Sequence, residues 1–359
     1  MVWRLQRAGM RIICLLTLVA CTQPPSAAPD PAREPAPEPA APGAVSDVVA
    51  TAGLGMVTNV RNLASCPMGA PPGATCRQVT VTGCPGIASE PLDAVVALRT
   101  QTGTLRGTVV HFSGSGGEGF QGSAQNYEAA GFRNVYIGWV SDWEQTQSAG
   151  IKTAGCRPAT ILQWVFSDPS LHNGSRTIGF CGEGMSGGSG QLGYALAHYG
   201  AAGVLDYVNE LSGPPFSRID IGCNGDAPPT SMVCGVADTT RLPSSLNAWE
   251  NIQLPLKCGS TSVPATELAR WKSDSIAVGG VYSYPRTQVQ FFGCTFQATA
   301  VTVMGNAYFN TISQAEGGNS NLAQYHCYFE ADGCQGEQLG TGLSDAKQAL
   351  IASCVPRHQ

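Results

Sequence analysis

The pattern of apolar and polar positions predicts strands and helices that alternate along most of this chain. Buried parallel strands are nearly continuous apolar runs, and residues 107–112 form such a run. Apolar positions three to four residues apart predict helices instead, as at residues 159–166. By these criteria strands are expected at residues 77–82, 94–100, 107–112, 135–140, 176–181, 203–209, 287–292 and 322–329, and helices at 159–166, 191–199, 266–274 and 344–353. This alternation indicates an α/β fold: a mostly parallel sheet with helices on both faces.

Residues 210–286 are long for a single connection between two strands. They contain Cys223, Cys234 and Cys258 together with several prolines and glycines. We interpret them as a disulfide-rich, cap-like insertion. Such an insertion would overhang the edge of the sheet and shape a substrate pocket there.

The first 21 residues predict an export signal. Three arginines without an acid precede a short apolar run, which is too short to span a membrane as a helix. The run ends in small residues before Cys21, and this ending resembles the lipobox of bacterial lipoproteins. The resemblance implies that Cys21 becomes the lipidated first residue, whereas the alternative is an ordinary secretory signal with an incidental cysteine.

Residues 22–44 are rich in proline and alanine, a composition that favours extended, polyproline-like chain over a packed core. We expect them to tether a single folded domain, residues 45–359, to the anchor. The expected location is therefore the cell envelope, in the periplasm or at the outer membrane. The membrane would be contacted through the lipid on Cys21.

Composition narrows the possible partners. Lysine and arginine number 20 against 25 acidic residues, for a net charge of −5, and no basic stripe indicates nucleic-acid binding. Phosphate-loop and dinucleotide-binding motifs do not occur, so no nucleotide cofactor is expected. The chain has 5 histidines and no Cys-x-x-Cys pair, which argues against a zinc or haem site.

Two of the 14 cysteines lie in the signal, which leaves an even number for the exported domain. Such a set implies disulfides formed in an oxidising compartment. The short separations Cys66–Cys76 and Cys223–Cys234 make these two local pairs plausible.

The stretch Gly184-Met185-Ser186-Gly187-Gly188 carries the main chemical signal. It lies between a predicted strand and a predicted helix, the setting in which Gly-x-Ser-x-Gly forces a sharp turn and exposes the serine hydroxyl. The helix would also direct its free N–H groups toward the serine. We therefore predict that Ser186 is a nucleophile for an acyl carbon. Ser189 is a lesser candidate that would cap the helix, and the alternative to both is a glycine turn without chemistry.

Together with the glycine-rich loop 113–119, which follows an earlier buried strand, this turn resembles the nucleophile elbow of the α/β-hydrolase fold. The resemblance covers roughly residues 77–353. It implies oxyanion donors at Gly187 and around Ser115 or Gly116. A loop without bulky side chains would let backbone N–H groups approach a substrate.

The resemblance also implies a catalytic acid and then a histidine, both after the serine. Only His326 has this order and lies near the last strand, so it is the expected base. However, it alternates with Gln324 and Tyr328 as one strand face. It would have to leave the strand or face the site, and otherwise it is a structural histidine.

The acid should follow the penultimate strand, but residues 293–297 contain no carboxylate. Asp220, one strand earlier, is the substitute that we favour. Asp206 and Asp274 remain alternatives.

These residues support two hypotheses. The first is an exported serine hydrolase that cleaves carboxylic esters through an acyl-enzyme on Ser186; peptidase, lipase, polyester hydrolase and acyltransferase activities remain open. In the second, Cys294 and Cys334 form a disulfide where the acid and histidine would lie. The protein is then a non-catalytic envelope lipoprotein on a degenerate hydrolase fold. The two differ in whether an imidazole reaches Ser186.

Overall fold

The computed structural model describes residues 53–87, 91–120, 127–146, 149–224, 263–294, 300–334 and 338–359. All of them belong to the unit Asp47–Gln359, which is separate from the unit Met1–Ser46. The predicted export signal, lipid anchor and tether lie outside the described residues. So does the middle of the predicted insertion, including Cys234 and Cys258.

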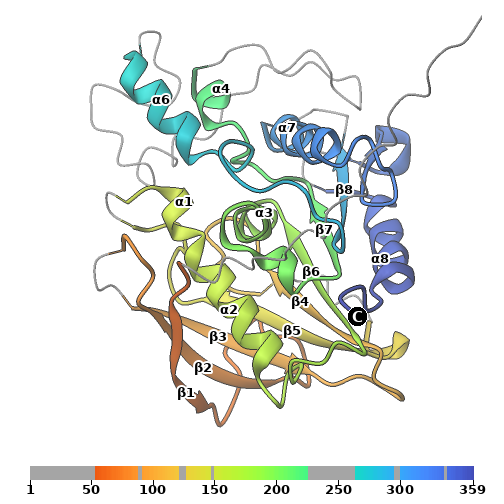
Figure 1. The fold of residues 1–359 in the computed structure, drawn as a ribbon. Coiled ribbons are helices and arrows are strands. Elements are labelled where there is room, and N and C mark those ends of the chain that lie inside the picture. The colour runs from red at the N-terminus through yellow and green to blue at the C-terminus, as the bar shows by residue number, and fades with distance from the viewer. Residues whose placement is uncertain are drawn as a thin grey trace, which may run out of the picture. The chain divides into compact units, whose positions relative to one another are not determined.

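The nine strands found in the described residues form one sheet in the order β1-β2-β3-β5-β4-β6-β7-β8-β9 (Figure 1). Their bounds are β1 Met56–Asn62, β2 Thr75–Thr82, β3 Leu92–Arg99, β4 Gly107–Phe112, β5 Phe132–Trp139, β6 Gly179–Met185, β7 Tyr207–Leu211, β8 Gln288–Cys294 and β9 Ala323–Tyr328. Strands β1, β2, β3 and β5 pair antiparallel, and every pair from β5 and β4 onward to β9 is parallel. The prediction of a mostly parallel sheet is confirmed.

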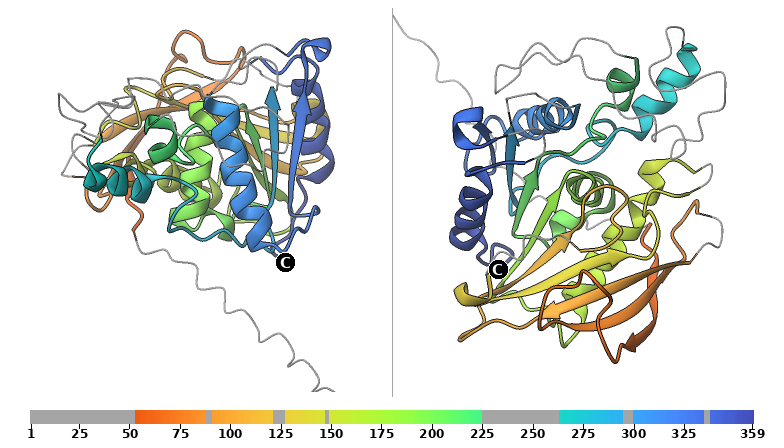
Figure 2. Two further views of the ribbon diagram at one scale, coloured as in Figure 1. Left: turned by 90° about the horizontal axis from the view of Figure 1, so that it is seen from above. Right: turned by 180° about the vertical axis from the view of Figure 1, so that it is seen from behind.

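Helices cover both faces of this sheet (Figure 2). One face packs against α2, α3 and α7, and the other against α8. The α-helices are α1 Ile151–Ala154, α2 Cys156–Ser167, α3 Gly187–Tyr199, α4 Ile219–Asn224, α6 Ala265–Asp274, α7 Ala300–Ala315 and α8 Gly342–Ser353. Short 3₁₀ turns are η1 Tyr127–Ala130, η2 Ala201–Gly203 and η3 Glu330–Asp332.

Two predicted elements need correction, and strand β1 and helix α7 were not predicted. Strand β6 ends at Met185 and not at residue 181. The prediction ended the strand too early because residues 182–184 are glycine and glutamate, which have low strand propensity. The first half of the strand predicted at 203–209 is wrong, since a 3₁₀ turn and a bend precede β7. Helix α7 was not predicted, because it has no charged residue and is rich in valine, threonine and asparagine, which are weak helix formers.

The sheet face under α8 carries a polar row, one side chain from each of six adjacent strands. The row consists of Tyr136, His111, Glu183, Asn209, Gln290 and Gln324, which are successive partners in the strand register. The Tyr207 hydroxyl donates to the side-chain oxygen of Asn209 at 2.6 Å, and the side-chain oxygen of Gln290 lies 3.0 Å from the same hydroxyl. Buried polar groups need such partners, and Tyr207 supplies them to Asn209 and Gln290 within the sheet.

Four disulfides join described residues. They are Cys66–Cys76, Cys84–Cys156, Cys181–Cys354 and Cys294–Cys334. The predicted pairs Cys66–Cys76 and Cys294–Cys334 are confirmed, while the predicted Cys223–Cys234 pair reaches outside the described residues. Such bonds are typical of proteins from oxidising compartments. No helix in the described ranges is long and apolar enough to cross a membrane.

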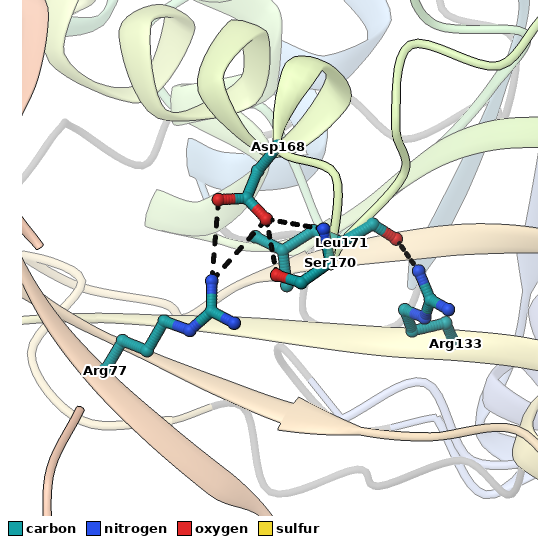
Figure 3. A network of polar contacts seen from close by, with 5 residues as sticks. All are labelled: Arg77, Arg133, Asp168, Ser170 and Leu171. Carbon is teal, nitrogen blue, oxygen red and sulfur yellow. Dashed lines mark hydrogen bonds and ion pairs between the residues drawn. The ribbon is translucent and has the colours of Figure 1, made fainter. Parts of the chain in front are cut away.

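A polar cluster fixes the turn that follows α2 (Figure 3). Asp168 accepts from the Arg77 side chain on β2 and from the backbone N–H of Ser170. Arg133 on β5 donates to the backbone carbonyl of Leu171. The turn is thereby tied to two strands.

Candidate active site

Ser186 follows β6 directly and caps the N-terminus of α3 with φ 54° and ψ −117°. A non-glycine residue with such a backbone costs roughly 1–3 kcal/mol and persists only where its surroundings fix it. Here the Ser186 N–H donates to the carbonyl of Leu211 on β7 at 2.9 Å, and its carbonyl accepts from the N–H of Gly190 at 3.1 Å. The turn is therefore held in a strained shape, as in a nucleophile elbow.

The glycines around Ser186 are required by close backbone contacts. A Cβ on Gly184 would lie 2.3 Å from the carbonyl oxygen of Gly188, and one on Gly188 would lie 2.2 Å from that of Phe112. Either contact is far too short for real atoms. Side chains at these two positions would therefore collide with helix α3 and strand β4.

The loop after β4 lies against the elbow. Gly117 donates to the carbonyl of Gly114 at 3.0 Å, which closes a tight turn with Ser115 at φ 51°. A Cβ on Gly187 would lie 2.0 Å from the carbonyl oxygen of Ser115. The structure thus brings together Ser115, Gly116 and Gly187 beside Ser186.

We call the backbone N–H groups of Ser115, Gly116 and Gly187 the cradle. No acceptor for any of the three is found among the described residues. Gly187 is the first residue of α3, and the first N–H groups of a helix have no acceptor within it. Three N–H groups without protein acceptors beside a serine hydroxyl are suited to bind a carbonyl oxygen.

Gln191 on α3 fixes the loop that carries the cradle. Its side-chain oxygen accepts from the indole N–H of Trp139 at 2.7 Å, and its amide donates to the carbonyl of Ser113 at 3.2 Å. The backbone N–H of Trp143 also donates to the carbonyl of Gly116 at 2.9 Å. The sequence analysis missed Gln191, although a glutamine directly after the glycine-rich elbow was a visible signal.

His326 stays within β9, where it is paired with Phe292 of β8. Met185, Leu211, Phe292 and His326 are successive partners on four adjacent strands. Since strands lie about 4.7–4.9 Å apart, the Cα atoms of Met185 and His326 are roughly 14 Å apart. The imidazole stacks on Phe292 with 4.6 Å between ring centroids, and burial lowers its pKa.

The other histidines are bound elsewhere. All five histidines of the chain lie within the described residues. The contacts of the remaining four are His111 with Asn134 and Glu183, His172 with Thr108 and Ser175, His198 with the backbone of Ser275 and Ile276, and His358 with Leu205. In the described part of the chain, the Ser186 hydroxyl has no hydrogen-bond partner, histidine or other.

Asp220 lies in α4, where both of its oxygens accept from the Arg218 guanidinium at 2.9 and 2.8 Å. Asp206, an alternative acid, accepts from the backbone N–H groups of Phe180 and Arg357. Neither is hydrogen-bonded to a histidine in the described structure. The structure thus brings the predicted nucleophile and oxyanion donors together, but not His326 or Asp220.

The Cys294–Cys334 disulfide lies beside the elbow on the α8 side. Cys294 ends β8, and Cys334 follows β9 in the loop where the resemblance placed the histidine. Both are buried in an apolar cluster with Met185, the residue before Ser186. Other members of the cluster are Leu211, Phe292, Tyr328, Leu339 and Ala346. Among the described residues, apolar side chains thus surround this disulfide.

Two fully buried glutamates flank the elbow on opposite faces of the sheet. Burial raises the pKa of Glu183, but hydrogen bonds with His111, Tyr127 and Asn209 outweigh it and hold the pKa below its usual range. Glu210 has no hydrogen-bond partner for either oxygen among the described residues, and burial raises its pKa well above the usual range. Glu210 is not among the candidate residues that the sequence indicated.

Comparisons with known proteins agree with this architecture. No family model and no curated protein matches the chain. Among solved structures, it is similar to acetyl xylan esterase 1 from Thermoanaerobacterium sp., at 12% identity and TM-score 0.51, over 82% of this chain and 86% of that one. It is also similar to the thermostable carboxylesterase EstE1 from a metagenomic library, at 14% identity and TM-score 0.50, over 78% and 90% of the two chains. The chain therefore has the α/β-hydrolase fold, and its structural neighbours include esterases.

Proposed function

We propose that this protein is an ester-binding protein on the α/β-hydrolase fold. In this proposal the Ser186 hydroxyl and the cradle recognise the carbonyl of a carboxylic ester without cleaving it. One observation carries the proposal: the Ser186 hydroxyl has no hydrogen-bond partner among the described residues, although every histidine of the chain is described. A serine without a base is a weak nucleophile.

The Cys294–Cys334 disulfide supports the same proposal. The atom that accepts the serine proton must lie within about 2.6–3.2 Å of the hydroxyl oxygen, or be linked to that oxygen by one water. The family resemblance places the acid after β8 and the histidine after β9, and there Cys294 and Cys334 are joined by a disulfide whose apolar cluster packs on Met185. The retained elbow strain and the three N–H groups still favour carbonyl binding.

The second candidate is carboxylic-ester hydrolysis through an acyl-enzyme on Ser186. It is supported by the strained elbow and the cradle, which would stabilise the oxyanion. In this candidate His326 takes the proton of Ser186 as the hydroxyl attacks the carbonyl and returns it to the leaving alcohol. Water then releases the acid by the same route. His326 would have to leave its stack on Phe292 for each turnover.

Hydrolysis and binding assays on the oxidised, exported protein distinguish the candidates. Acetate, butyrate and octanoate p-nitrophenyl esters would be tested with wild type, Ser186→Ala and His326→Ala. We expect wild-type turnover to equal the Ser186→Ala background, while calorimetry detects saturable binding of a stable ethyl ester. Turnover lost in both variants would establish the hydrolase with His326 as base. Turnover lost only in Ser186→Ala would establish the hydrolase with another base, and either result contradicts the binding proposal.

We further propose that the protein is exported and held at the cell envelope by a lipid on Cys21. The lipobox-like ending of the signal and the Pro/Ala-rich residues 22–44 support an anchor followed by a tether. The disulfides are consistent with an oxidising compartment. Metabolic labelling with a radioactive fatty acid, compared between wild type and Cys21→Ser, would test this; equal labelling of both would contradict it.

A further inference from the structure

We propose that Asp142 makes the Ser186 site selective for an ester that carries a positive charge close to its carbonyl. The inference rests on the proposed carbonyl site and adds the chemical class of the ligand. Asp142 comes three residues after the end of β5. Its Oδ1 atom would lie only 1.8 Å from a Cβ placed on Gly116. A carboxylate oxygen therefore lies directly against a cradle residue.

The same turn contacts Ser186 on its other side. A Cβ on Gly114 would lie 3.7 Å from the Cβ of Ser186. Ser186 and Asp142 thus flank the short turn 114–117. A ligand whose carbonyl oxygen accepts from the cradle has its neighbouring atoms within reach of the Asp142 carboxylate.

No cation neutralises this carboxylate within the described residues. Oδ2 accepts from the side-chain amide of Gln145 at 3.1 Å, and Oδ1 accepts from no described donor. Asp142 is half-buried and carries no ion pair within the described residues. A cationic ligand would supply the opposite charge.

The charged groups near Asp142 form no salt bridge with it among the described residues. Burial raises the pKa of Glu144 well above its usual range, and the charge of Asp142 raises it further. Arg157, the nearby cation, donates to the backbone carbonyls of Trp143 and Gln145 at 2.8 and 2.6 Å. A carboxylate against the cradle would also oppose an oxyanion there, so Asp142 fits a site that binds a neutral carbonyl better than one that stabilises a tetrahedral intermediate.

Three esters of one acid, alike in size, test the inference by calorimetry on the oxidised full chain. They carry a trimethylammonium-ethyl group, its uncharged 3,3-dimethylbutyl counterpart and an anionic carboxyethyl group. For opposite charges a few ångström apart in a partly exposed site, we expect the cationic ester to bind about 10- to 100-fold more tightly than the neutral one. The anionic ester should bind most weakly.

Asp142→Asn should abolish this preference and leave the affinity for the neutral ester within about threefold. The matched control is Glu118→Gln, an exposed carboxylate of the same loop, which should keep the preference. Equal wild-type affinities for the cationic and neutral esters, or a preference that survives in Asp142→Asn, would overturn the inference and leave the carbonyl site intact. If none of the esters binds, the carbonyl site itself is refuted and the inference falls with it. The wild-type comparison decides the question even if Asp142→Asn does not fold.

Discussion

Replacing Glu210 by glutamine should change the pH dependence of stability in a direction that the structure determines. Glu210 lies on the interior strand β7, fully buried, with no hydrogen bond to either oxygen from the described residues. Burial therefore raises the pKa of Glu210 in the folded protein well above its usual range. In the unfolded chain its pKa returns to about 4.3.

The sign follows from proton linkage. Between the unfolded and the folded pKa, the native state binds one proton more than the unfolded state, so stability falls as pH rises. The slope for one group is at most about 1.4 kcal/mol per pH unit, which sets an upper bound of about 2.7 kcal/mol from pH 5 to pH 7. Glutamine does not titrate, so Glu210→Gln removes this contribution. The stability of the variant relative to wild type should therefore rise with pH by up to that amount over the same interval.

Urea unfolding at pH 5, 6 and 7 would measure the effect. The quantity to compare is the change with pH of the difference in unfolding free energy between variant and wild type. A difference that is the same at every pH reports only how well the glutamine amide packs. Glu118→Gln, at an exposed site, is the control and should give no such change. A difference between Glu210→Gln and wild type that stays constant from pH 5 to pH 7 would refute the reasoning.

Three further changes have predicted outcomes. Glu183→Gln should lower the unfolding free energy at pH 7 by about 1.5–3 kcal/mol, because the buried carboxylate accepts hydrogen bonds from Tyr127 and Asn209. Since the pKa of Glu183 is lowered in the folded protein, the loss should shrink as pH falls from the unfolded pKa of about 4.3 through the folded pKa; urea titrations at pH 7 and pH 3 would show this, and an equal loss at both would contradict it. Ser186→Gly should raise stability by about 1 kcal/mol by relieving the positive φ, and a lower melting temperature would contradict the strain. Replacing both Cys294 and Cys334 by alanine opens a loop with a sequence separation of 40 and should lower the free energy of unfolding by about 4 kcal/mol. Urea unfolding would measure this loss, and an unchanged unfolding midpoint would contradict it.

The half of the candidate site that could be predicted from the sequence is local. Ser186 and Gly187 are neighbours in the chain, and the glycine-rich loop that carries Ser115 follows a strand that the apolar pattern defines by itself. Short-range sterics fix both turns, so residue types at fixed spacing are sufficient. The same locality explains why the strands and helices were mostly expected at the right places.

The other half depends on contacts between distant segments. Whether His326 leaves β9 depends on how far that strand pairs with β8, and the pairing continues through His326 to Tyr328. Glu210 lies within an otherwise ordinary strand, and only the packing of helices on that face makes it buried. Asp220 was different: its partner Arg218 is two residues away, and this short-range ion pair could have been anticipated.

The polar row under α8 has a consequence for how the strands find their alignment. Strands buried on both faces are usually almost uniformly apolar, so neighbouring alignments of such strands differ little in energy. In this sheet, a shift of β6 by one residue would turn Glu183 from His111 toward the apolar face under α3, and the carboxylate would lose its hydrogen bonds. A shift by two residues would restore the face but separate the partners. The row thus penalises misaligned sheets during folding and leaves one pairing favoured across six strands.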